Sequence, residues 1–140
     1  MARPTSFRLP EELLERLEDD ARTSGASVTS LVAMLLDEGL KTRRYPGIVY
    51  RDGAMGRRAG IIGGPDVWEV VRDLRHGRGR GMARLAAVAQ ELGLPAARVQ
   101  LAADFYATFP DEIDAMIEID DATARRVRAL VERRERLLTS

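Results

Sequence analysis

Residues 4–17, PTSFRLPEELLERL, combine a strand pattern with a helix pattern at the N-terminal part of this chain. Apolar and polar residues alternate over residues 4–9, which is the period of a β-strand. Pro10 ends that strand and suits the first turn of a helix, where Glu11 and Glu12 match the positive helix end. A lone strand leaves its backbone N–H and C=O groups unpaired. Its partner must therefore lie elsewhere in the chain or on a second copy of it.

Two helices are predicted after this strand. Leucines repeat at helical spacing from Leu13 until Gly25, which fits a helix C-cap. Ser27 can cap a second helix, which we expect to end near residues 41–44, where cations suit a helix C-terminus. A strand and two helices of about 40 residues bury too little surface to be stable. We therefore expect that residues 1–44 do not stand alone.

Composition limits the classes of protein to consider. The chain has 140 residues, with 22 basic and 22 acidic side chains and a formal net charge of zero. This length allows one domain or two small ones. A net charge of zero can still include local patches of positive or negative charge. The absence of cysteine removes disulfides and thiolate metal sites. No membrane helix or signal peptide is recognised, so we expect a cytoplasmic protein with no membrane partner.

A small hairpin is predicted in the middle of the chain. Residues 47–53 (GIVYRDG) and 57–62 (RRAGII) are typical of two short strands separated by turn residues. Asp66 can then cap a helix that contains Trp68, which we expect to be a core residue. The glycine-rich stretch HGRGRG, residues 76–81, predicts a loop.

Two further helices are predicted from about residue 82 to 92 and from about 95 to 109. Ala89, Gly93 and Val99 supply a small residue, a turn glycine and a β-branched core residue. This spacing is typical of a helix-turn-helix, in which two helices pack closely at a steep angle.

The remaining sequence predicts helices to the end of the chain. A helix restarts at Pro110, and a long charged helix with a thin apolar stripe is expected over the tail. The predicted fold class is therefore mainly α, with one small β-hairpin. We divide the chain into residues 1–44, 45–121 and 122–140.

The first 44 residues resemble the MetJ/Arc/CopG ribbon-helix-helix family. The resemblance rests on the strand TSFRLP, the helix EELLERLEDDA, the turn SGAS and the helix VTSLVAMLLDEGL, in that order. It implies an intertwined homodimer in which two strands pair as an antiparallel ribbon that enters the major groove. It also implies DNA-binding roles for Arg3, Ser6, Arg8, Ser27, Val28 and Thr29.

The chemistry of these residues suits DNA. Arg8 can reach a guanine edge with two hydrogen bonds, and Ser6 can donate or accept one. Free N–H groups at a helix N-terminus such as that after Ser27 bind anions. Pro4 replaces the usual polar residue, so Arg3 is expected to contribute instead. Taken alone, Ser27 is equally well an ordinary N-cap. Arg8, taken without the surrounding pattern, is more often a solvated edge charge.

Residues 45–118 resemble the domain of unknown function in antitoxins paired with PIN-like (VapC-type) toxins, which makes the chain VapB-like. The resemblance rests on Arg57, Arg58, Gly60, Val67, Trp68, Val99 and Tyr106. The chain lacks the usual proline beside the hairpin arginine, and its HGRGRG loop is unusual for that family. Antitoxins of this kind often cover the toxin's active site with a C-terminal segment. The tail arginines that could pair with toxin carboxylates are Arg125, Arg126, Arg133, Arg134 and Arg136.

The second predicted helix pair has two interpretations. Its outward residues are a weakly charged mixture: Arg98, Gln100 and Asp104. The basic density precedes it, at Arg72, Arg75, Arg78, Arg80 and Arg84. Phosphate binding needs such a cluster, but a solubilising loop has the same composition. We slightly favour a dimerisation or protein-binding module over a second DNA reader.

Enzymatic interpretations are weak. His76 is the only histidine, and a lone loop histidine usually faces solvent. The stretch GIIGGPD lacks the lysine and threonine of a phosphate-binding loop, and the acidic run after Pro110 does not match a calcium loop. We expect neither catalysis nor a metal or other cofactor.

These observations predict the antitoxin of a type II toxin–antitoxin pair. It would bind operator DNA as a homodimer, repress its own operon and neutralise a PIN-like ribonuclease, in assemblies that can exceed a dimer. Two alternatives stay open. One is a stand-alone dimeric regulator without a toxin, and the other is an arginine-rich accessory protein that binds nucleic acid without sequence preference.

Overall fold

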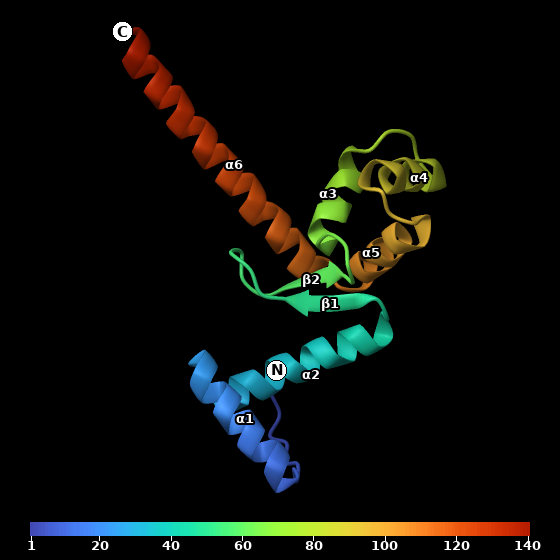
Figure 1. The fold of residues 1–140 in the computed structure, drawn as a ribbon, viewed down its shortest axis with the longest axis vertical. Helices are drawn as coiled ribbons and strands as arrows, with labels where there is room; N and C mark the ends of the chain where they lie inside the picture. Colours follow the sequence, from blue (N-terminus) through green and yellow to red (C-terminus); the bar gives the residue numbers. More distant parts are fainter. The chain divides into compact units, whose positions relative to one another are not determined.

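The computed structural model describes residues 1–140, and the chain divides into two compact units, Met1–Arg44 and Tyr45–Ser140. The first unit contains helices α1 (Glu11–Ser24) and α2 (Val28–Arg44) (Figure 1). Gly25 closes α1 in the left-handed conformation at φ 72°, which glycine adopts without steric cost. Both predicted helices and the glycine cap between them are confirmed.

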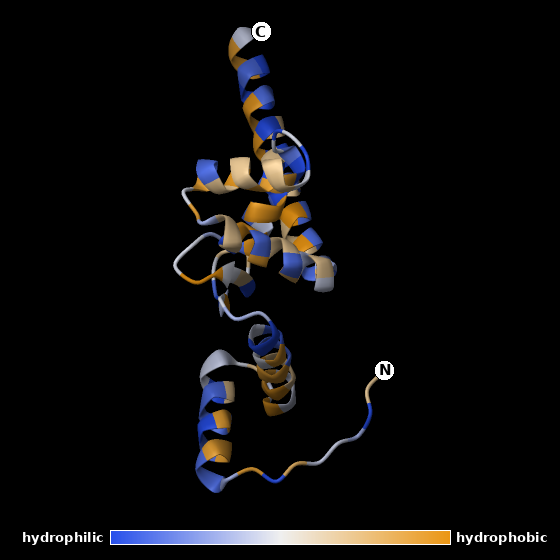
Figure 2. Cartoon of the chain, turned by 90° about the vertical axis from the view of Figure 1, so that its right-hand side faces the viewer, coloured by the Kyte–Doolittle hydropathy of each residue, from blue (hydrophilic) through white to orange (hydrophobic).

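Residues 1–10 form no strand in the single chain. Figure 2 shows them as an extended segment leading into α1. The strand predicted over residues 4–9 is thus absent here, and the two-stranded sheet of the second unit does not include it. The physical reason is that a strand needs a neighbour to pair its N–H and C=O groups.

Most large apolar side chains of the first unit are exposed. Among its hydrophobic residues only Ala21 and Leu31 are buried. Besides Met1, the exposed ones are Phe7, Leu9, Leu13, Leu14, Val28, Met34, Leu35, Leu36 and Leu40. Phe7 is 74% and Leu40 68% exposed. An apolar surface of this size relative to so small a unit marks an interaction site.

The second unit contains one hairpin and four helices. Strands β1 (Ile48–Arg51) and β2 (Arg58–Ile61) pair antiparallel, with Ile48 opposite Ile61 and Arg51 opposite Arg58. The helices are α3 (Val67–His76), α4 (Gly81–Leu92), α5 (Ala96–Thr108) and α6 (Pro110–Thr139). The predicted hairpin is confirmed, and the predicted helices α3 to α5 begin and end within about two residues of these bounds.

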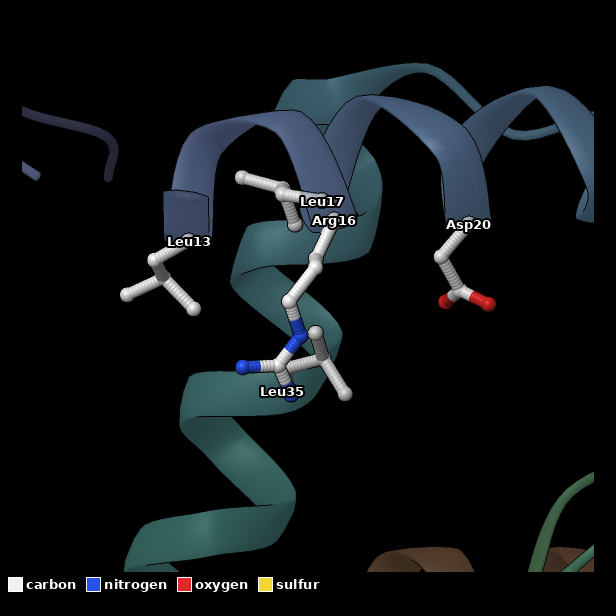
Figure 3. Close-up of a pocket in the computed structure, with 5 residues that line it drawn as sticks. All are labelled: Leu13, Arg16, Leu17, Asp20 and Leu35. Carbon is white, nitrogen blue, oxygen red and sulfur yellow. The ribbon is translucent and has the colours of Figure 1, made fainter. Parts of the chain in front are cut away.

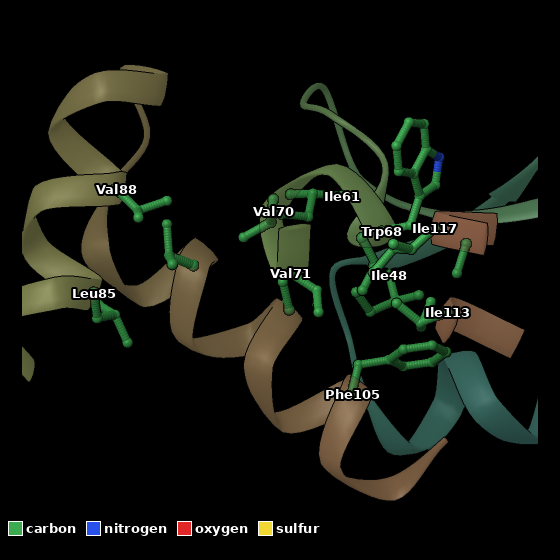
Figure 4. Close-up of a cluster of buried hydrophobic side chains, with 14 of the residues drawn as sticks. Ile48, Ile61, Trp68, Val70, Val71, Leu85, Val88, Phe105, Ile113 and Ile117 are labelled. Atoms are coloured by element: carbon green, nitrogen blue, oxygen red, sulfur yellow. The ribbon is translucent and has the colours of Figure 1, made fainter. Parts of the chain in front are cut away.

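One hydrophobic core joins the hairpin to the helices of this unit (Figure 4). Phe105 is fully buried at its centre, and its ring meets that of Tyr45 edge-on at a centroid distance of 5.6 Å. Trp68 is also buried, as predicted. Edge-to-face aromatic pairs add stability beyond the area that they bury.

Helix α6 is one uninterrupted helix of 30 residues. No break occurs between residues 121 and 122, where the sequence analysis placed a boundary, because no glycine or proline follows Pro110. Ile113 and Ile117 anchor the first part in the core, whereas the last part projects away from the other helices of the unit (Figure 1). None of the six helices is long and apolar enough to cross a membrane.

Candidate nucleic-acid interface

The N-terminal segment presents all three of its predicted DNA-binding residues to solvent. Arg3, Ser6 and Arg8 are exposed and precede α1 in a segment without regular structure. The alternate residues Phe7 and Leu9 are exposed as well. A strand would place Ser6 and Arg8 on one face and these two apolar side chains on the other. In the single chain these residues are therefore accessible, but no strand yet places Ser6 and Arg8 on one face.

The start of α2 is an ordered cap. The Ser27 Oγ accepts a hydrogen bond from the Ser30 backbone N–H at 3.1 Å and donates one to the Ser30 Oγ at 2.9 Å. The predicted N-cap is thus confirmed. The N–H groups of Val28 and Thr29 lie in the first turn, where a helix offers them no internal acceptor. No acidic residue occupies that turn, so it can receive an anion such as a phosphate.

A hollow lies between α1 and α2 of the first unit. It measures about 310 Å³ and is lined by Leu13, Arg16, Leu17, Asp20 and Leu35 (Figure 3). In Figure 3 the Arg16 side chain extends toward Leu35, and the Asp20 carboxylate lies farther along the same side of α1. No pattern in the sequence marks Arg16 or Asp20 as members of a site.

A second hollow on the same unit is wholly apolar. It measures about 170 Å³, and its lining residues are Leu9, Leu13, Leu17, Val32, Leu35 and Leu36. The two hollows share Leu13, Leu17 and Leu35. Apolar side chains of a second helix pair could fill this surface, as knobs on one helix fill gaps on another.

In the second unit, Asp66 joins the hairpin to α3. Its carboxylate accepts hydrogen bonds from Arg51 Nη2 at 2.8 Å, from Arg58 Nε and from the Trp68 indole N–H at 3.2 Å. Its backbone N–H donates to Glu69 at 2.9 Å. The two arginines face each other in the ladder, and like charges opposite one another are destabilising. The buried carboxylate therefore balances a charge pair that the hairpin register creates.

Most of the predicted basic cluster is engaged within the protein. Arg72 lies 5.1 Å above the Trp68 ring and pairs with Asp120 at 3.4 Å. Arg75 pairs with Asp114, and Tyr106 donates to the same carboxylate at 2.9 Å. The bond from Arg75, followed by that from Tyr106, lowers the pKa of Asp114 below its usual value. These arginines fasten α3 to α6 and are not free for phosphate.

The three residues of the predicted helix-turn-helix pattern lie where that motif needs them, two in the core and one in the turn. Ala89 and Val99 are buried, and Gly93 is left-handed at φ 66° between α4 and α5. The outward Gln100 donates to Asp104 at 2.9 Å, so both side chains are occupied. The helix-turn-helix stays a prediction, since no observation here reports on its function.

The tail of α6 differs from the rest of the unit in having few internal contacts. Arg125 bonds Glu118 at 3.0 Å, and Arg134 approaches Glu135 at 3.5 Å. The other predicted toxin-binding residues, Arg126, Arg133 and Arg136, have no acidic partner within the chain. The apolar stripe beside them is exposed at Val127, Leu130, Val131, Leu137 and Leu138.

Candidate metal ligands do not gather anywhere in the described chain, residues 1–140. No group of three or more histidine or acidic side chains is placed to hold a metal ion. His76 is exposed at the end of α3.

The comparison with protein families agrees with the geometry of the first unit. A family model described as a CopG-like RHH_1 or ribbon-helix-helix domain, RHH_5, matches residues 8–44. The first unit therefore matches a ribbon-helix-helix domain, and this match supports a DNA-binding transcription regulator. The match includes Arg8, Ser27, Val28 and Thr29 and stops where the second unit begins. Neither curated proteins nor solved structures gave a match.

Proposed function

We propose that this chain is a dimeric DNA-binding repressor and the antitoxin of a type II toxin–antitoxin pair. The observation that carries the first part is a ribbon-helix-helix domain whose apolar side chains are left exposed by the single chain. A second copy would bury them and would supply the missing strand partner. Dimerisation would then precede DNA reading.

The DNA contacts divide into two kinds. In the paired ribbon, Ser6 and Arg8 would face the major groove, where arginine recognises guanine with two hydrogen bonds. The first turn of α2 would bind a phosphate through the N–H groups of Val28 and Thr29. Arg3 would add a contact from the N-terminal arm. Occupying the operator in this way would block transcription of the chain's own operon.

The proposed toxin-binding segment is the tail of α6, residues 122–140. It contains six arginines and two glutamates beside an exposed apolar stripe. A helix with this pattern fits an acidic groove with an apolar floor, and arginine pairs with carboxylates through two parallel hydrogen bonds. A PIN-like nuclease, whose active site gathers carboxylates for metal, offers that chemistry.

Co-purification with the product of the adjacent gene tests the toxin-binding part. We expect a stable complex in which that product's ribonuclease activity is inhibited. Deleting residues 122–140 should abolish inhibition and leave DNA binding intact, because the core anchors Ile113 and Ile117 remain. Unchanged inhibition by the truncated chain would refute the role of the tail.

A stand-alone dimeric regulator is the second candidate function. The family match lies wholly within the first unit, which favours DNA binding independently of any toxin. Specific binding to its own promoter, without a complex with the neighbouring product, would support this alternative over the antitoxin.

A further inference from the structure

The structure separates the arginines of the second unit by what they contact. Seven lie within ion-pair distance of an acid: Arg51, Arg57, Arg58, Arg72, Arg75, Arg125 and Arg134. Arg84 and Arg98 donate to backbone carbonyls. Outside the tail of α6, the remaining two are Arg78 and Arg80, both exposed in the loop between α3 and α4.

This loop has a fixed shape. Arg84 Nε donates to the Gly79 carbonyl at 3.0 Å, and its Nη1 donates to the Leu74 carbonyl at 3.4 Å. A Cβ at Gly77 would come within 3.1 Å of the Asp73 carbonyl oxygen and of Val88. A side chain at this position would therefore crowd its neighbours, and Arg84 ties both ends of the turn together. The two free arginines project from an ordered turn.

The charge around the loop is not balanced locally. No acidic residue occurs between Asp73 and Glu91, and the first turn of α4 contains none. The first turns of α2 and α5 also contain none, whereas those of α1, α3 and α6 each contain at least one. Arg78 and Arg80 thus add positive charge with no acidic residue close to them in the sequence, although the whole chain has no net charge.

We infer that the loop over residues 77–80 binds the sugar–phosphate backbone of DNA. A protein partner would need an apolar centre at its interface, and the only large apolar side chain exposed near the loop is Met82. Phosphate contacts need only positive charge and N–H donors. Contacts to the sugar–phosphate backbone contribute affinity and orientation without reading bases.

This inference rests on the proposed DNA binding by the first unit. Once that unit is bound, the second unit is held near the duplex by the chain itself, which raises its local concentration there. Each phosphate contact steepens the dependence of log affinity on log salt by about 0.9. Two arginines per chain would therefore add up to about 3.6 to the slope for a dimer.

The test uses fluorescence anisotropy to measure the affinity for the DNA upstream of the chain's own gene at about 50 to 200 mM salt. The slope of log affinity against log salt concentration is then compared between variants. Arg78→Ala/Arg80→Ala should make the slope shallower by about 2 to 4, and Arg78→Lys/Arg80→Lys should keep it. The control Arg57→Ala removes an exposed charge of the same unit that is paired with Asp52, and it should leave the slope unchanged. Thermal unfolding should be equal for all four proteins.

The outcomes are distinguishable from a failure of the proposed function. A slope unchanged by Arg78→Ala/Arg80→Ala, with DNA binding still sensitive to Arg8→Ala, overturns the inference alone. If Arg78→Ala/Arg80→Ala loses binding to the protein partner while the salt slope of DNA binding is unchanged, the loop binds an acidic protein. That result would also overturn the inference. Absence of any DNA binding by the wild-type chain would overturn both the inference and the proposed function.

Discussion

The Ser27 hydroxyl accepts a hydrogen bond from the Ser30 backbone N–H at 3.1 Å and so caps the third residue of α2. The cap leaves the N–H groups of Val28 and Thr29 at the positive end of the helix without an intrahelical acceptor. One side chain thus stabilises the helix and shapes the proposed phosphate site.

Substitutions at Ser27 separate these two roles. Ser27→Ala removes the cap and should lower the free energy of unfolding by about 1 kcal/mol. Ser27→Asp keeps a capping oxygen and suits the helix dipole, so stability should be kept. Its negative charge should nevertheless repel phosphate and weaken DNA binding at least tenfold. Urea unfolding and fluorescence anisotropy measure the two effects, and full DNA affinity in Ser27→Asp would exclude the phosphate site.

Leu35→Glu tests the apolar surface of the first unit. Leu35 lines both hollows between α1 and α2 and is 45% exposed in the single chain. If a second copy covers it, a buried charge there should convert the dimer to a monomer. Sedimentation velocity measures the change. The control Leu137→Glu alters the exposed tail instead, and loss of the dimer only in that control would place the dimer contact on α6.

Asp66→Asn should destabilise the second unit by about 3 kcal/mol, because it leaves two facing arginines without their buried counter-charge. Trp68 is the only tryptophan, and its indole N–H bonds the same carboxylate at 3.2 Å. Its fluorescence during urea unfolding therefore reports this site directly. The control Glu69→Ala removes only the bond to the Asp66 backbone and should cost about 1 kcal/mol. Equal losses for the two variants would show that the ion pairs contribute no more than the capping bond, which contradicts the prediction.

Acid should weaken the contact between α3 and α6. The bond from Arg75 lowers the pKa of Asp114 in the folded state below the usual 3.8. The contribution of this carboxylate is therefore complete above pH 3.8 and is lost as the pH falls through the lower folded-state pKa. Asp114→Asn should reduce the loss of stability in that acidic range. Urea midpoints measured from pH 6 downward compare the two proteins, and parallel curves would contradict the prediction.

Local signals in the sequence predicted much of the fold. Gly25 marks a helix end by its left-handed backbone, and Ser27 and Asp66 mark helix starts by capping bonds that act over a few residues; all three predictions are confirmed. The hairpin followed similarly from alternation between turn residues.

Long-range pairings could not be predicted in the same way. Arg72 and Asp120 are 48 residues apart, and only the packing of α3 against α6 brings them together. The five arginines therefore look like one basic cluster in the sequence. In the structure Arg72 and Arg75 pair with acids and Arg84 donates to a backbone carbonyl, which leaves Arg78 and Arg80 free. The N-terminal strand is a different case, because its proposed partner lies outside the single chain.

The most direct test of the central claim is the ratio of affinities for the chain's own upstream DNA and for a scrambled duplex of equal length, at one salt concentration. Specific binders typically prefer their site by a factor of about 10³ or more, and each bidentate base contact contributes about 1–3 kcal/mol to that preference. We predict that Arg8→Ala lowers the ratio at least tenfold. Arg22→Ala, which removes an exposed arginine paired with Asp19 on the same unit, should leave it unchanged. An undiminished ratio in Arg8→Ala would contradict the proposed reading of DNA by the N-terminal ribbon.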